Sequence, residues 1–150
     1  DEMVATTTLL NKVGIALAAN PAVHAITDVT GFGILGHGLE VARGADLTVR
    51  LELADLPFLS QAEALAQAGH VTGASGRNWA SYGDFVDLPE GIPGWQRGLL
   101  SDPQTSGGLL VACAEDSAEA ILRSIVESGC ASARIIGRAE PGAPRVRIVN

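Results

Sequence analysis

The segment over residues 27–37 constrains the fold of this chain more than any other feature. It reads Thr-Asp-Val-Thr-Gly-Phe-Gly-Ile-Leu-Gly-His and follows an apolar run that begins at Val23. Its three glycines favour a tight turn, because glycine adopts backbone angles that other residues avoid. We therefore expect a strand over 23–29, a turn over 30–33 and a helix over 34–43 that is ended by Gly44.

Apolar periodicity and turn residues predict the other elements. A helix over 2–19 should stop at the Asn20-Pro21 pair, and the strict alternation over 47–53 is typical of a half-buried strand. The later expectations are a helix from the capping box Ser60–Glu63 to Gly69, mostly irregular chain over 71–94, a short helix over 95–100, a strand over 109–114, a helix capped by Asp116 and closed by Gly129, and two strands around 135–136 and 146–148.

The connection between the last two strands decides the fold class. A tight turn at Pro141-Gly142 joins them, so we expect them to be antiparallel. Strands and helices interleave along the rest of the chain. The pattern therefore favours an α+β fold, with a mixed or antiparallel sheet and helices packed on it, over a doubly wound parallel sheet. The 150 residues fit one domain, and because Asp1 leads at once into a helical pattern we expect a piece of a longer protein.

Composition excludes several functional classes. The net charge is −7, from 17 acidic and 10 basic residues, and no basic stripe is present, so we expect no nucleic-acid partner. The longest apolar runs are far shorter than the roughly 20 residues of a membrane span, so we expect no membrane association. Two cysteines, Cys113 and Cys130, are too few for a disulfide framework, which fits a cytoplasmic protein.

Asp28 leaves three interpretations open. Gly31, Gly33 and Gly36 match a dinucleotide-binding fingerprint, with Glu52 as the later acidic residue, but an unneutralised Asp28 would repel a pyrophosphate. A magnesium ion between the carboxylate and phosphate oxygens would remove that repulsion, beside a helix N-terminus that favours anions. Asp28 could instead only cap the following turn, as aspartate commonly does.

Two further segments could contribute to a site. Residues 101–108 read Ser-Asp-Pro-Gln-Thr-Ser-Gly-Gly, which either lets the backbone approach an anion closely or only forms a turn before a strand. Residues 73–83 either carry a site or form a loop that is packed down by Trp79 and Tyr82. The three histidines lack metal-ligand spacing, although His37 could approach a bound phosphate. No complete nucleophile or kinase motif is present.

These segments resemble a known enzyme family. Residues 27–37 resemble the TDVTGFGLLGH segment of selenophosphate synthetases, residues 77–83 their RNFASYG segment and residues 99–110 their LLCDPQTSGGLL segment. Ser101 stands where the quoted motif has Cys, and we expect little consequence from that difference. The motifs occur in the family's order, so the chain resembles the C-terminal domain of these enzymes, within the aminoimidazole ribonucleotide synthetase superfamily.

The resemblance implies an ATP-dependent reaction in which ATP, selenide and water give selenophosphate, AMP and phosphate. It also implies a homodimer formed through N-terminal domains, and an active site between the two domains of each subunit. The reactive Cys or selenocysteine and the catalytic Lys would lie in the N-terminal domain, so we expect no catalytic residue within 1–150. Asp28 matches a family Mg²⁺ ligand. The expected nucleotide-binding residues are Thr30, Gly31, Gly33, Thr105, Ser106, Gly107 and Gly108.

Two alternative functions stay open. One is another ATP-dependent member of the superfamily, of the hydrogenase-maturation or thiamine-monophosphate kinase type, although these lack the Arg-Asn-x-Ala-Ser-Tyr-Gly segment. The other is a non-catalytic regulatory domain that has kept the fold. The complete motif around Asp28 argues against that second alternative.

Overall fold

A computed structural model describes residues 2–150 of the chain. Its α-helices are α1 (Glu2–Thr7), α2 (Val13–Ala18), α3 (Gly33–Ala45), α4 (Ala62–Gln67), α5 (Gly73–Tyr82), α6 (Gly94–Leu100) and α7 (Ala118–Glu127). Its strands are β1 (Val23–Asp28), β2 (Thr48–Glu52), β3 (Val86–Asp87), β4 (Leu109–Cys113), β5 (Gly137–Glu140) and β6 (Arg145–Val149). Short 3₁₀ helices are η1 (Leu53–Asp55), η2 (Gly83–Phe85) and η3 (Glu115–Ser117). Over residues 2–150, no helix has both the length and the apolar character needed to cross a membrane.

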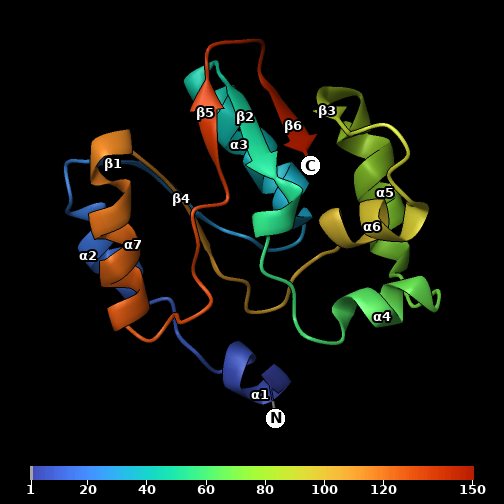
Figure 1. The fold of residues 1–150 in the computed structure, drawn as a ribbon, viewed down its shortest axis with the longest axis horizontal. Coiled ribbons are helices and arrows are strands. Elements are labelled where there is room, and N and C mark those ends of the chain that lie inside the picture. The colour runs from blue at the N-terminus through green and yellow to red at the C-terminus, as the bar shows by residue number, and fades with distance from the viewer. Residues whose placement is uncertain (1) are drawn as a thin grey trace.

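The strands form two separate sheets. β1 pairs antiparallel with β4, and the other strands form a sheet in the order β3-β6-β2-β5. Within this larger sheet β6 is parallel to both β2 and β3, whereas β5 is antiparallel to β2. The larger sheet is therefore mixed and helices pack on it, which confirms the α+β class predicted from the sequence (Figure 1).

The last two strands run in opposite directions, as expected, but they do not pair with each other. β2 lies between them and pairs with both. Pro141 and Pro144 at the ends of the connecting turn have no N–H that could continue a ladder across it. Thr48 Oγ1 donates a 2.8 Å hydrogen bond to the carbonyl oxygen of Ala143. The turn therefore passes over the start of β2 and does not close a hairpin.

The expected single helix over 2–19 is wrong, because the chain leaves the helical path between α1 and α2. In this break Asn11 Nδ2 donates a 2.9 Å hydrogen bond to the carbonyl oxygen of Gly107, a contact that periodicity cannot reveal. The predicted capping box is also wrong. The Ser60 hydroxyl donates to the Glu2 carboxylate at 2.6 Å, and α4 begins at Ala62 without a side-chain cap.

The expectation of mostly irregular chain over 71–94 is wrong as well, because this range contains α5. Thr72 caps the helix, its Oγ1 accepting a 3.2 Å hydrogen bond from the N–H of Ser75. Small polar residues and glycines give this segment weak helix propensity, so packing of the buried Ser75 and Tyr82 stabilises it.

Two predicted helix ends are shifted by tertiary context. The helix after the turn runs to Ala45, and Asp46 in the left-handed conformation ends it, not Gly44. Ser117 immediately precedes α7, while Asp116 lies one residue earlier in η3 and accepts a hydrogen bond from the Ser117 hydroxyl.

The hydrophobic core lies between α3 and the larger sheet. Leu35 and Leu39 of α3 are almost fully buried in one cluster with Val146 of β6, and α3 contacts both β2 and β6. Tyr82 of α5 and Leu100 of α6 belong to the same cluster. In Figure 1 α3 lies along the larger sheet and α5 and α6 lie on the right, while α2 and β1 lie on the left. The core therefore holds the N-terminal end of α3 in a fixed place relative to α5 and α6.

Candidate functional site

The segments over residues 27–37 and 99–110 lie side by side because β1 and β4 pair. Asp28, the last residue of β1, is opposite Leu109. Beyond the strands, the Val29 N–H donates to the Gly108 carbonyl and the Gln104 N–H donates to the Thr30 carbonyl, each at 2.9 Å. The turn after β1 (residues 29–32, the β1–α3 turn) and the loop before β4 (residues 101–108, the 101–108 loop) therefore form one continuous surface.

Glycine is required at two points of this contact. Gly33 has φ +67°, and a Cβ there would lie 2.9 Å from the carbonyl oxygen of Asp102. A Cβ on Gly107 would collide with the carbonyl oxygen of Val29. Larger residues would push the two segments apart, so the glycines are what allow the backbones to approach. The predicted turn is confirmed by the bond from the Gly33 N–H to the Thr30 carbonyl at 3.1 Å.

The motif over residues 77–83, which lies in α5 and η2, joins these two segments. Asn78 Nδ2 donates to the Gly31 carbonyl at 2.8 Å and to the Ser101 carbonyl at 3.0 Å. The Tyr82 hydroxyl donates to the Phe32 carbonyl at 2.7 Å, and burial raises the pKa of Tyr82 to about 12. The Asn78 amide thus bridges the β1–α3 turn and the 101–108 loop, and the Tyr82 hydroxyl holds the same turn through the Phe32 carbonyl.

A second bridge ties the 101–108 loop to the start of α5. One carboxylate oxygen of Asp102 accepts hydrogen bonds from the hydroxyls of Thr72, at 2.9 Å, and Ser75, at 2.8 Å. Ser101, the residue that differs from the family motif, is buried, and its hydroxyl donates to the Arg97 carbonyl at 2.9 Å. A hydroxyl at this position is therefore satisfied within the end of α6 and does not face the loop surface.

Asp28 is exposed at the point where these segments meet. Among residues 2–150 its carboxylate forms no hydrogen bond or ion pair within the contact distances that define the others in this site, so it does not cap the following turn. Nor does the described part of the chain bring three or more His, Cys, Asp or Glu side chains together as a metal site would. One free carboxylate fits Mg²⁺, which commonly takes one or two protein carboxylates and keeps water and phosphate oxygens as its other ligands.

The remaining predicted site residues lie in the β1–α3 turn, at the start of α3 and in the 101–108 loop, and they differ in exposure. Gly31 and Gly108 are exposed, as are Thr105 and Ser106, and Ser106 has a left-handed backbone with φ 55°. Thr30 is half-buried, and Gly33 is buried against the backbone of Asp102. Their contact with a nucleotide stays a prediction, and the structure gives Gly33 a packing role of its own.

His37 occupies a position that the sequence singled out without giving it a function. The ring is buried and lies 5.7 Å from the Phe32 ring, between centroids. Its Nδ1 lies 2.8 Å from Glu40 Oε2 and its Nε2 lies 3.2 Å from Thr30 Oγ1. The partner Glu40 was missed, although its spacing of three residues on a helix is the signal that could have found it.

Sequence reasoning also missed the individual side chains that join the segments. Asn78 and Asp102 lie inside quoted motifs, yet nothing in a linear pattern tells which carbonyl or hydroxyl they contact. The signal available was the residue type, because amides and carboxylates that become partly buried commonly form hydrogen bonds.

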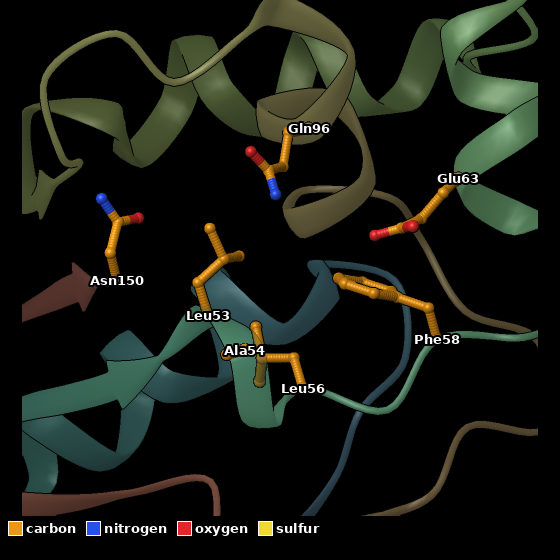
Figure 2. A pocket seen from close by; sticks show the side chains of 7 residues that line it. All are labelled: Leu53, Ala54, Leu56, Phe58, Glu63, Gln96 and Asn150. Carbon is orange, nitrogen blue, oxygen red and sulfur yellow. The ribbon is translucent and has the colours of Figure 1, made fainter.

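A hollow of about 330 Å³ lies elsewhere on the molecule, shown in Figure 2. Glu63 of α4, Gln96 of α6 and the terminal Asn150 face one another across it, above the apolar side chains of η1 and the residues after it. Its lining residues are Leu53, Ala54, Leu56, Phe58, Glu63, Gln96 and Asn150. None of them belongs to the three motifs, so the candidate site is the surface around Asp28 and not this hollow.

The dinucleotide-binding interpretation is wrong. That motif needs a strand, a helix and a second strand parallel to the first in one sheet. Here β1 and β2 flank α3 but lie in different sheets. Glu52, the candidate acidic residue, forms an ion pair with Arg50 at 2.8 Å.

Comparison with known proteins agrees with the three motifs. The family model described as "AIR synthase related protein, C-terminal domain" matches residues 2–149. A selenide, water dikinase of Rhizobium meliloti (strain 1021) is 57% identical over 150 residues, covering 100% of this chain. Enzymes of the same name from Pseudomonas straminea and Burkholderia pseudomallei (strain K96243) are 56% and 55% identical over 96% and 98% of the chain.

The chain spans only 43%, 40% and 42% of the lengths of these relatives. The resemblance predicted from the motifs is confirmed at the level of the family and of the names that the relatives carry. The match over residues 2–149 shows that this chain belongs to the AIR synthase related family and is a C-terminal domain of that family.

Proposed function

We propose that this chain is the C-terminal domain of a selenide, water dikinase and supplies one side of its phosphoryl-transfer site. The observation that carries the proposal is the free, exposed carboxylate of Asp28, held where the β1–α3 turn meets the 101–108 loop. Identities of 55–57% to relatives of that name support the assignment of the reaction class.

The chemistry of phosphoryl transfer suits this arrangement. Such reactions depend on positioning and charge neutralisation more than on covalent chemistry by the protein. Asp28 would hold a Mg²⁺ ion, which when bound neutralises charge on the phosphates. The exposed backbone of Gly31 and Gly108, with the hydroxyls of Thr105 and Ser106, would border the nucleotide phosphates of ATP.

The remainder of the site would come from another part of the protein. The relatives are more than twice as long as this chain. Several apolar side chains near the start of the chain are exposed, as is common for surfaces that another domain covers: Met3, Val4, Leu9, Leu10 and Ile15. We propose that this surface packs against the enzyme's own N-terminal domain, and that the intact enzyme is a homodimer in the cytoplasm.

The test is Asp28→Asn in the intact enzyme, with selenide-dependent ATP consumption as the readout. The amide keeps the size of the side chain but loses the charge that Mg²⁺ requires, so turnover should fall on the order of a thousandfold. The melting temperature should move little, because the Asp28 carboxylate has no internal bond to lose within residues 2–150.

The matched control is Asp116→Asn, which makes the same exchange at another exposed aspartate, in η3. An amide oxygen can still accept the bond from the Ser117 hydroxyl, so both activity and stability should stay near wild type. Near-normal turnover in the Asp28→Asn variant would show that this carboxylate does not hold the metal ion of the reaction, and it would leave the regulatory-domain alternative standing.

A further inference from the structure

Three side chains form a hydrogen-bonded chain that ends in the candidate site. Glu40 is 55% exposed at one end and the ring of His37 is buried in the middle. At the other end is the hydroxyl of Thr30, which is half-buried in the β1–α3 turn, two residues after Asp28. This series of hydrogen bonds therefore connects the outer surface of α3 to the surface that would face a nucleotide.

The geometry of α3 makes this series of hydrogen bonds possible. His37 and Glu40 are three residues apart on α3 and so lie on one face of the helix. The Nδ1–Oε2 distance of 2.8 Å and the Nε2–Oγ1 distance of 3.2 Å use both ring nitrogens. With both nitrogens engaged and the Phe32 ring beside it, the imidazole has little freedom to rotate.

The donors and acceptors among Glu40, His37 and Thr30 determine what the Thr30 hydroxyl can bind. A carboxylate only accepts, so Nδ1 carries a proton. A phosphate oxygen also only accepts, so a threonine that serves it must donate its hydroxyl proton to it. That proton is free for a phosphate only when Nε2 donates to Oγ1, which requires a proton on both ring nitrogens, and the Glu40 carboxylate beside Nδ1 stabilises such a ring.

We propose that His37 and Glu40 are positioning residues that hold the Thr30 hydroxyl toward a phosphate of the bound nucleotide. Thr30 is then the group that touches the phosphate, and the other two act only through it. This inference rests on the proposed function, since it names how one side of the same site binds ATP. If His37 were purely structural, its loss would lower the stability of the core and leave the KM for ATP unchanged.

A double-mutant cycle in the intact enzyme separates these two roles. Thr30→Val removes the hydroxyl at constant shape and should raise the KM for ATP on the order of tenfold, with a smaller change in kcat. Thr30→Ser keeps the hydroxyl and should recover most of that loss. His37→Gln should also raise the KM, but adding it to Thr30→Val should raise the KM no further.

Glu40→Gln provides an independent variant, because a half-exposed side chain can be changed without risk to the fold. It keeps an acceptor for Nδ1 but removes the charge that supports the ring, so the KM for ATP should rise several-fold. Glu90→Gln, the same exchange at an exposed glutamate far along the chain, should leave the KM unchanged.

The outcomes separate this inference from the function on which it rests. If the wild-type enzyme consumes ATP with selenide but the KM effects of Thr30→Val and His37→Gln multiply, the positioning role is wrong. A fall in kcat and melting temperature with an unchanged KM in the His37 and Glu40 variants would also overturn it. A wild-type enzyme without selenide-dependent ATP consumption would overturn the proposed function itself, and this inference with it.

Discussion

At the scale of single residues, the site depends on side chains whose polar groups are held by one or two specific partners. Asn78 bridges two carbonyls, Asp102 accepts from two hydroxyls and His37 joins Glu40 to Thr30. The bonds of Asn78 and Asp102 cross from one segment to another, whereas His37 joins two residues that lie in its own helix and in the turn before it. Removing one partner of any of these bonds leaves the other polar group unsatisfied. Asp28 differs from all of them, because its carboxylate is exposed and has no hydrogen-bond or ion-pair partner within residues 2–150.

Tyr82 gives a prediction at this scale, because it is the single tyrosine of the chain. Burial raises its pKa from 10.0 to about 12, so its neutral form is favoured in the folded state. The corresponding stability is fully present below pH 10 and is lost as the pH rises through about 12. Tyrosinate absorbance of the 150-residue chain should therefore report one transition near the raised pKa.

The comparison for this titration is Tyr82→Phe. The variant should lose the absorbance change and the part of the alkaline destabilisation that belongs to Tyr82. Burial also raises the pKa of the Cys113 thiol, so some alkaline sensitivity should persist in the variant. A tyrosinate transition at the usual pKa in the folded chain would contradict the burial of Tyr82.

At the scale of elements, α3 connects the core to the site. Its apolar face packs on the larger sheet, and its first residue, Gly33, contacts the 101–108 loop. The helix contains glycines with very different surroundings. Gly33 has a left-handed φ and close backbone neighbours, whereas Gly44 has open space around it near the other end.

The same substitution at the two ends of α3 should have opposite effects. Gly33→Ala should lower the free energy of unfolding by roughly 1–3 kcal/mol, because alanine is strained at positive φ and its Cβ would meet the Asp102 carbonyl. Gly44→Ala should raise it by a few tenths to about 1 kcal/mol, because alanine is the better helix former. Denaturant unfolding of both variants measures the two changes in the free energy of unfolding. A stabilising effect of Gly33→Ala would show that the β1–α3 turn is not as tight as described.

At the scale of the whole molecule, two sheets and the helices around them bring three distant segments to one surface. The relatives are more than twice as long as this chain. At the junction of these segments the Asp102 carboxylate is hydrogen-bonded to Thr72 and Ser75, whereas the Asp28 carboxylate has no hydrogen-bond or ion-pair partner among residues 2–150. The chain has a single lysine, Lys12, which lies before α2 and is exposed. A single carboxylate without partners can hold one metal ion, and we expect neutralising a triphosphate to need further metal ligands and cationic groups.

We therefore expect the 150-residue chain by itself to fold but not to turn over ATP. Phosphate release with Mg²⁺ and ATP should stay at background, and circular dichroism should show a cooperative melt. The Asp28→Asn variant of the same chain identifies contaminating activity, because a contaminant is unaffected by that change. Metal-dependent turnover that disappears in the variant would show that the chain is a complete enzyme.

The sequence by itself determined the fold class, most element positions and the segments that make up the candidate site. Strand and helix periodicity, and glycines between Asp28 and His37, are local signals, so they could be interpreted along the chain. Only the tertiary structure decided that β2 separates β5 from β6, that α5 is a helix and that Asn78 and Asp102 join the segments. Each of those outcomes depends on partners far apart in sequence or on which face of a helix is covered. The pattern of residues along the chain does not reveal such contacts, because their energies arise only when the folded backbone brings the groups within hydrogen-bonding distance.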